Sequence, residues 1–188
     1  MSDPIYFDYQ ATTPTDPRVL EVMLPFFGAQ FGNPHSTSHE RGTAAADAVE
    51  EARSKIATAI NSDPREIIFT SGATEANNLA ILGAAGFWEG RKSQILTFAT
   101  EHKCVLEATK SLNDKNWETK VLPVRDTGVA NLESLTENLS NQTALVSLMA
   151  ANNETGVLQP IAEASALCEK VGAYLHCDAA QALGKIPV

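Results

Sequence analysis

The feature that most constrains the fold is a repeated pattern in which a short apolar run ends in a tight cluster of polar residues. Four such runs occupy residues 67–69, 95–99, 144–149 and 174–177. Segments with the apolar spacing of helices separate the runs, and strands that alternate with helices form parallel sheets. Because ligands bind at the carboxyl edge of open α/β sheets, the pattern predicts that all four polar clusters line one ligand-binding edge.

The expected elements give a mostly parallel α/β sheet with helices on both faces. From residue 66 onward, strands and helices alternate in the sequence pattern, and a turn precedes the third helix. The expected strands are residues 66–69, 94–99, 118–123, 143–149 and 173–177, and the expected helices are residues 73–88, 103–113, 131–138 and 160–171.

The first part of the chain has a different pattern. Three prolines punctuate residues 1–16, which are expected to be extended, and Asp16 followed by Pro17 is typical of the start of a helix over residues 17–28. A second helix carries an apolar stripe at positions 45, 49, 52, 56 and 60. We therefore expect an extended segment over 1–16 and part of one large ligand-binding domain over 17–188.

Composition excludes several classes of partner. The 188 residues carry 14 basic and 23 acidic side chains, a net charge of −9, which argues against nucleic acid or an anionic membrane as the main partner. An odd, sparse set of three cysteines fits a reducing compartment. The N-terminus lacks the pattern of a signal peptide, and no apolar run approaches the roughly 20 residues that span a bilayer. We expect a cytoplasmic protein.

The first polar cluster predicts an anion site. A helix that begins near Ala73 presents unpaired N–H groups and a partial positive charge, and Gly72 lets an anion approach closely. The hydroxyls of Ser71 and Thr74 can add hydrogen bonds. The same residues can instead serve only as an N-cap.

The other three clusters carry an imidazole, amides and a carboxylate. His102 can stack on a ring or move protons, or it can be a plain surface residue. The amides of Asn152 and Asn153 can bind an oxygen substituent or simply form a turn. Asp178, at the end of a buried strand, needs a cation or several donors, such as a protonated ring nitrogen.

Asp178 can also be a helix N-cap or a metal ligand with His176 and Cys177. Since zinc-type ligand spacing is found nowhere else in the chain, no metal site is predicted. The joint placement of an anion site, an imidazole, amides and a carboxylate at successive strand ends suits an anionic, ring-shaped cofactor.

Six motifs in this order resemble those of the cysteine desulfurases, which are pyridoxal-phosphate enzymes of the class V aminotransferase group with fold type I. The resemblance covers the whole chain without large gaps. The motifs are Asp8–Pro14, Phe31–Pro34 with Ser36 and Ser38–His39, Thr70–Glu75, Thr100–Lys103, Asn152–Gly156 and His176–Gln181.

The resemblance implies a role for each of six residues around pyridoxal 5'-phosphate. These roles are cofactor phosphate binding by Ala73 and Thr74, ring stacking and proton relay by His102, contact with the ring hydroxyl or substrate carboxylate region by Asn153, pairing with the pyridinium nitrogen by Asp178, and a hydrogen bond to the ring oxygen by Gln181.

The resemblance also implies a reaction and partners. L-cysteine yields alanine, and its sulfur moves to an enzyme cysteine as a persulfide. The sulfur then passes to an iron–sulfur scaffold or to other sulfur-acceptor proteins, including those of tRNA thiolation, and the full-length protein is a homodimer. The implied activity is that of a transferase that carries out sulfur transfer for iron–sulfur cluster assembly or thio-cofactor synthesis.

Two catalytic parts of the family are expected outside this chain. The lysine that forms the Schiff base belongs to a Ser-x-His-Lys motif shortly after the Asp-x-x-Gln segment, which places it just beyond Val188, and the sulfur-accepting cysteine lies further on. Neither Lys103 nor Lys185 fits that motif. Cys104 is expected to be buried or helix-facing, and Cys168 and Cys177 to be small hydrophobic residues. We therefore expect no cysteine turnover from these 188 residues alone.

Three alternatives stay open at the level of the sequence. One is a sister class V activity, namely selenocysteine lyase, kynureninase-like cleavage or transamination. Another is a non-catalytic fragment that retains a cofactor pocket and a dimer surface. The third, an ordinary nucleotide-binding α/β domain, is disfavoured because the chain has neither a Gly-x-Gly-x-x-Gly nor a Walker motif.

Overall fold

A computed structural model describes residues 4–187 of the chain. The chain forms two compact units, Met1–Phe69 and Thr70–Val188. Residues 4–16 contain no helix or strand. The division into an extended segment over 1–16 and part of a large domain over 17–188 stays a prediction.

The first unit contains two helices, α1 (Pro17–Met23) and α2 (Glu40–Ala59). The Asp16 carboxylate caps α1 by accepting a hydrogen bond from the backbone N–H of Arg18 at 2.8 Å. The expected helix over 17–28 changes at residue 24 into the 3-10 helix η1 (Leu24–Phe27). Pro25 explains the change, because it has no N–H with which to continue the α-helical ladder.

Helix α2 begins earlier than the apolar stripe indicates. His39 precedes it and accepts a hydrogen bond from the backbone N–H of Gly42 through Nδ1 at 3.1 Å. Of the expected stripe only Ala45 is buried, whereas Ile56 and Ile60 are exposed. The helix is therefore confirmed, but its apolar face is only partly covered by described residues.

The expected strand over residues 66–69 is wrong. The 3-10 helix η2 (Pro64–Glu66) occupies its start, and residues 67–69 are extended without a strand beside them in the described chain. The guanidinium of Arg53 donates to the carbonyl of Ile67, and the side chains of Ile68 and Phe69 are 69% and 48% exposed. An extended segment becomes a strand only when a partner takes up its backbone groups.

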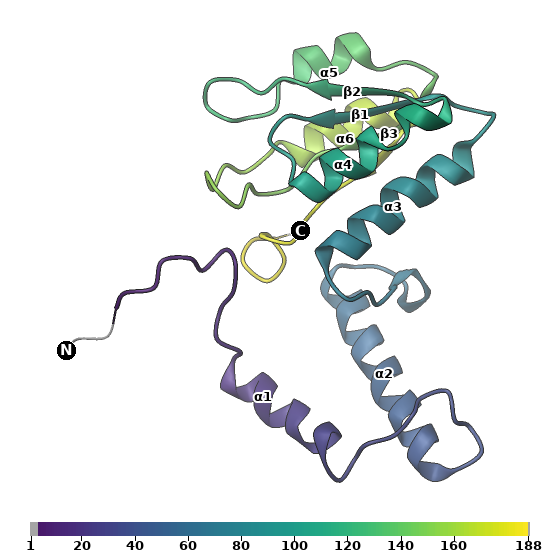
Figure 1. Ribbon diagram of the computed structural model, residues 1–188, viewed down its shortest axis with the longest axis vertical. Coiled ribbons are helices and arrows are strands. Elements are labelled where there is room, and N and C mark those ends of the chain that lie inside the picture. Colours follow the sequence, from purple (N-terminus) through teal and green to yellow (C-terminus); the bar gives the residue numbers. More distant parts are fainter. Residues whose placement is uncertain (1–3, 188) are drawn as a thin grey trace. The chain divides into compact units, whose positions relative to one another are not determined.

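The second unit contains a four-stranded sheet (Figure 1). Its strands are arranged in the order β2-β1-β3-β4. All of them are parallel, which confirms the predicted mostly parallel sheet. Every residue of the central strands β1 and β3 is buried, which explains why apolar side chains occupy adjacent positions, and therefore both faces, in the middle of each strand. The strands are β1 (Gln94–Phe98), β2 (Glu118–Leu122), β3 (Thr143–Ser147) and β4 (Tyr174–His176).

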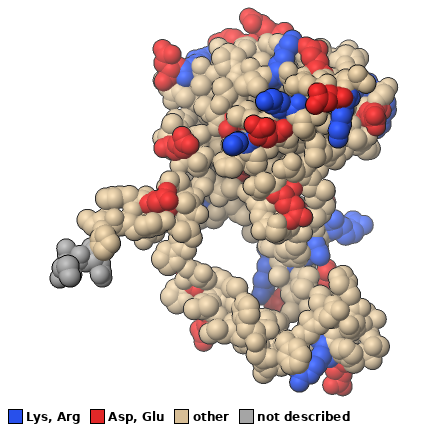
Figure 2. Space-filling model, in the orientation of Figure 1, with Lys and Arg blue, Asp and Glu red and all other residues tan. Residues whose placement is uncertain are grey.

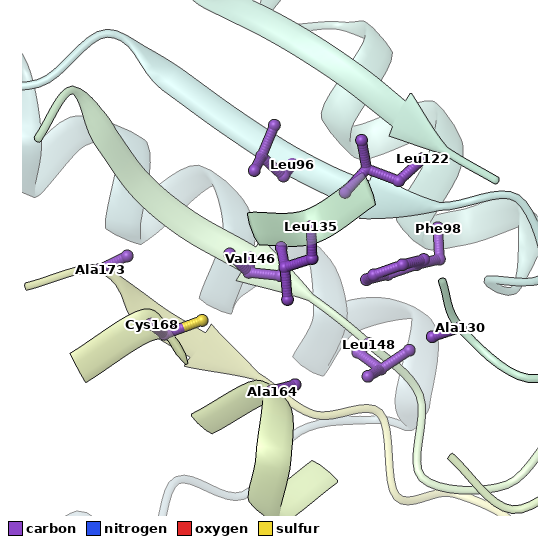
Figure 3. Close-up of a cluster of buried hydrophobic side chains, with 10 residues drawn as sticks. All are labelled: Leu96, Phe98, Leu122, Ala130, Leu135, Val146, Leu148, Ala164, Cys168 and Ala173. Atoms are coloured by element: carbon purple, nitrogen blue, oxygen red, sulfur yellow. The ribbon is translucent and has the colours of Figure 1, made fainter. Parts of the chain in front are cut away.

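Helices cover both faces of this sheet. Leu96 and Phe98 of β1 point into a core with α5 (Leu132–Asn138) and α6 (Ile161–Glu169), which Figure 3 shows. Ile95 belongs to a second core with α3 (Ala73–Trp88) and α4 (Lys103–Lys110). A short 3-10 turn, η3 (Asn113–Lys115), follows α4. The alternation of strand side chains between two cores confirms the predicted α/β layers.

The surface of the chain carries charges of both signs. On the face shown in Figure 2, acidic and basic side chains are interspersed, without a continuous basic patch. Within residues 4–187, no helix is both long and apolar enough to cross a membrane.

Candidate cofactor site at the carboxyl edge of the sheet

The start of α3 has the features of an anion site. Ala73 is the first helical residue, and no side chain caps the helix at Gly72. A Cβ atom at Gly72 would meet no atom within 4 Å. Ala73 and Thr74 are exposed, and within residues 4–187 no group accepts a hydrogen bond from their backbone N–H groups. The first turn therefore offers a positive dipole end to an anion. Part of the capping alternative is also present, because the Glu75 carboxylate accepts a hydrogen bond from the backbone N–H of Ser71 at 2.6 Å.

Asp178 lies two residues past the end of β4 and is only 9% exposed. Its Oδ1 accepts a hydrogen bond from the backbone N–H of Ala180 at 2.9 Å, and its Oδ2 accepts one from Nδ2 of Asn77 at 2.8 Å. Within the described chain it has no ion pair with a lysine or an arginine. A buried carboxylate held by neutral donors retains a strong preference for a cation.

His102 caps the start of α4, and its ring is exposed. Its Nδ1 accepts a hydrogen bond from the backbone N–H of Cys104 at 3.2 Å and lies 3.0 Å from the Cys104 thiol sulfur. Because the backbone N–H points at Nδ1, we assign the proton of the neutral imidazole to Nε2. This arrangement leaves an N–H donor on the open side of the ring.

Asn77 connects His102 and Asp178. The amide nitrogen that donates to Asp178 also lies 3.3 Å from the sulfur of Cys104, which contacts His102. Asn77 is 4% exposed and lies one helical turn after Ala73 in α3. The sequence analysis missed this residue, because its burial and its contacts appear only in the folded chain.

The two neighbouring asparagines have different roles. Asn152 is structural, because its Nδ2 donates to the Thr100 carbonyl at 2.9 Å while its Oδ1 accepts from the backbone N–H groups of Glu154 and Thr155. This pattern is a side-chain turn that joins the loops after β1 and β3. Asn153 is half-buried, and its amide makes no hydrogen bond within residues 4–187. Its amide can therefore bind a ligand.

Glu101 is a second functional candidate that the sequence analysis did not single out. It is 5% exposed, and its two oxygens accept from the backbone N–H of Met149 and the hydroxyl of Ser147. Burial raises the pKa of Glu101 to about 7, and the charge of Asp178 adds to this rise. Ser147 also contacts Nδ1 of His176 at 2.8 Å. A weakly acidic buried network therefore lies beneath this edge of the sheet.

The structure thus links His102 to Asp178 indirectly, through Cys104 and Asn77, and α3 carries Ala73 about one turn before Asn77. Gln181 is half-buried in the turns that follow Asp178, and its Oε1 accepts from Lys185 at 3.4 Å. The candidate residues therefore come from loops at the carboxyl ends of β1, β3 and β4 and from the start of α3, as predicted. The first of the four strands expected to carry them is missing from the sheet.

The three cysteines differ in environment. Cys168 is buried in the core of Figure 3, and burial raises its pKa to about 11, so it is a small hydrophobic residue as expected. Cys177 is exposed one residue beyond β4, so the expectation of a small hydrophobic residue packed in a strand is wrong there. Cys104 is half-buried. Within residues 4–187, no group of three or more histidine, cysteine and acidic side chains is placed to hold a metal ion.

The aminotransferase class-V family model matches residues 5–188, and the chain belongs to this family. The family is one of pyridoxal-phosphate enzymes, so the class inferred from the sequence motifs is confirmed.

Among curated relatives, the cysteine desulfurase IscS of Rickettsia felis is 54% identical over 185 residues. That match covers 98% of this chain and 45% of the relative. Among solved structures, a NifS-like protein has a TM-score of 0.93 at 43% identity, covering 97% of this chain and 50% of its own. SspA in complex with cysteine has a TM-score of 0.91 at 36% identity, covering 97% and 52%. The chain therefore spans about half the length of the relatives it matches.

Proposed function

We propose that this chain is the cofactor-binding part of a cysteine desulfurase that uses pyridoxal 5'-phosphate. The observation that carries the proposal is the buried carboxylate of Asp178, held by two neutral donors and without a cationic partner in the described chain. A protonated pyridine nitrogen is the partner that such a carboxylate lacks. The similarity to curated cysteine desulfurases supports this choice within the family.

The residues present fit the cofactor at both of its polar ends. The start of α3 at Ala73 and Thr74 suits the phosphate, because an anion there accepts hydrogen bonds from backbone N–H groups and meets the positive end of the helix dipole. The free amide of Asn153 and the side chain of Gln181 are proposed for the ring oxygen. These side chains leave the ring nitrogen to Asp178.

When bound, pyridoxal phosphate supplies an electron-poor ring that accepts the electron pair released at the α-carbon of an amino acid. Asp178 would hold the proton at the ring nitrogen, since a carboxylate favours the charged form of a neighbouring base. His102 is proposed to cover the ring face, with its proton at Nε2 available for transfer. The Cys104 N–H fixes this tautomer by bonding Nδ1 at 3.2 Å.

The proposed substrate is L-cysteine, whose sulfur leaves as alanine forms. We propose a cytoplasmic homodimer as the working form, with an iron–sulfur scaffold or another sulfur-acceptor protein as the partner that receives the sulfur. The chain described here contributes the cofactor edge, and we propose that the Schiff-base lysine and the acceptor thiol lie in the remaining part of a full-length protein.

The test restores a protein of family length by joining residues 1–188 to the remaining part of the Rickettsia felis relative. Supplied with pyridoxal phosphate and L-cysteine, the joined protein should release sulfide in the presence of a thiol reductant. Asp178→Ala should nearly abolish the release, whereas Asp126→Ala, at an exposed loop position, should not change it. Normal sulfide release by the Asp178 variant, or none by the unsubstituted protein, would contradict the proposal.

A further inference from the structure

Asn77 links the two sides of the candidate ring site, because it contacts Asp178 directly and reaches His102 through Cys104. Its Nδ2 donates to Oδ2 of Asp178 at 2.8 Å and lies 3.3 Å from the sulfur of Cys104. An asparagine amide has two hydrogens, so a single nitrogen can serve both partners at once. The cluster is therefore one connected group of side chains rather than two separate residues.

The contacts of Asp178 restrict its carboxylate to one orientation. The backbone N–H of Ala180 donates a hydrogen bond to Oδ1 at 2.9 Å, and Nδ2 of Asn77 donates one to Oδ2. With a donor fixed at each oxygen, rotation of the carboxylate would break a hydrogen bond inside a buried site, which is costly. Because the Ala180 donor lies in the same turn as Asp178, Asn77 is the contact that ties the carboxylate to a rigid helix.

The second contact of Asn77 reaches His102. The Cys104 sulfur that faces the amide lies 3.0 Å from Nδ1 of His102. With Asn77 donating to the sulfur, the thiol hydrogen is free to point at Nδ1. That contact supports the same neutral tautomer as the backbone N–H of Cys104 does.

The position of Asn77 argues against a purely structural role. It is 4% exposed on α3, on the side of the helix that also buries Ile81 and Ala85. An apolar side chain would pack there without the desolvation cost of an amide. The hydrogen bonds of its amide to Asp178 and Cys104 explain a polar residue at this buried position.

We infer that Asn77 is a positioning residue for the cofactor ring, an inference that rests on the proposed function. It holds the Asp178 carboxylate in the orientation that receives the ring nitrogen, and through Cys104 it holds the imidazole of His102. It touches neither the cofactor nor the substrate in this role.

The test uses the full chain and pyridoxal 5'-phosphate with a ring nitrogen-15 label as the probe. The nitrogen resonance of the bound probe is followed against pH, and the affinity is measured by absorbance. Two variants remove the donor with opposite packing effects: Asn77→Leu keeps the branched shape and fills the site, whereas Asn77→Ala leaves space. Asn138→Ala is the control, because this half-buried helical asparagine donates only to a backbone carbonyl, that of Ser134.

We expect both Asn77 variants to lower the titration midpoint of the bound ring nitrogen by about one pH unit, a tenfold change in its proton affinity. The control should leave it unchanged. Midpoints equal to that of the unsubstituted chain in both Asn77 variants would overturn the inference. A structural role alone would weaken binding in the Ala variant more than in the Leu variant without moving the midpoint, which also overturns it.

Asp178→Asn separates this inference from the proposed function. If it lowers the midpoint while the Asn77 variants do not, only the positioning role fails. If Asp178→Asn leaves the midpoint unchanged, or the unsubstituted chain binds no probe at millimolar concentration, the proposed cofactor site fails and the inference with it. Circular dichroism of each variant confirms that a changed midpoint comes from a folded protein.

Discussion

Glu101 allows the electrostatics beneath the site to be tested by a single substitution. Burial raises its pKa from 4.5 to about 7, the Asp178 charge adds to the rise, and the hydrogen bonds from Met149 and Ser147 offset part of it. A difference of about 2.5 pH units between the folded and unfolded states corresponds to about 3 kcal/mol. Glu101→Gln, which removes the charge, should therefore stabilise the fold at neutral and alkaline pH.

The hydrogen bonds around Glu101 accommodate the amide of glutamine. Its carbonyl can accept a hydrogen bond from the backbone N–H of Met149, and its NH₂ group can donate to the hydroxyl of Ser147. That hydroxyl then donates to Nδ1 of His176, which lies 2.8 Å away. Burial lowers the pKa of His176, so at neutral and alkaline pH the uncharged ring can accept a hydrogen bond. The protonated form of Glu101 would make the same set of bonds, which makes glutamine a close mimic of the neutral acid.

The sign follows from which state binds the proton more tightly. As the pH rises from about 4.5, Glu101 of the unfolded chain ionises first, while the folded state keeps its proton up to about pH 7. The unfolded state therefore binds fewer protons in this window, and stability falls as the pH rises. The stability of Glu101→Gln minus that of the unsubstituted chain should be near its minimum at pH 4 and larger by about 3 kcal/mol at pH 8.

Urea denaturation of the full chain at several pH values, followed by tryptophan fluorescence, measures this difference. Trp117 is buried in the core between the sheet and α3 and α4, and Trp88 packs against it, so both report on residues 70–188. Subtracting the two curves removes the opposite pH dependence of His176. Glu118→Gln is the control, because hydrogen bonding to Lys120 lowers the pKa of this exposed carboxyl. A Glu101 difference that is constant or falls with pH would refute the reasoning.

Three further predictions follow from the fold and the site. The 188-residue chain alone should release no sulfide from L-cysteine, and a sulfide assay that detects release would contradict this. Borohydride treatment with pyridoxal phosphate should leave no pyridoxyl adduct on its lysines, as read by mass spectrometry of the intact chain. Phe98→Ala should lower the free energy of unfolding by about 3–5 kcal/mol, because the ring is fully buried in the core of Figure 3, whereas Val121→Ala, at an exposed strand position, should cost far less.

The sheet could be predicted from the sequence because each of its strands carries a strong local signal. Residues 94–98 and 143–147 are buried on both faces and carry adjacent apolar residues in their middle, a pattern that parallel sheets favour. Helix α3 was predicted with its observed bounds, since Gly72 precedes a long apolar segment. Signals that depend on neighbouring residues in the chain were thus sufficient for the layers and for the edge where the clusters meet.

The segment 67–69 was mispredicted for the opposite reason. Its three apolar residues have the local preference of a strand, but strand formation also requires a partner for the backbone groups. In the described chain, the only side-chain hydrogen bond to the backbone of this segment comes from the guanidinium of Arg53, which donates to the Ile67 carbonyl. Local sequence could not reveal that the partner strand is missing.

The candidate site residues also fall into two groups, those that the sequence motifs indicate and those that only the folded structure reveals. Ala73, Asn153 and Asp178 follow strand or helix boundaries, and motif spacing finds them. Asn77 and Glu101 are recognisable only after folding, because burial turns an ordinary amide and an ordinary carboxyl into groups that must be bonded. Motif spacing identifies residues that face the edge, whereas the residues that hold them come from interior positions of a helix and a loop. If Asn77 acts as inferred, substituting it should change the titration midpoint of the cofactor's ring nitrogen. Substituting Glu101 should change the free energy of unfolding. Neither side chain contacts the cofactor in these roles.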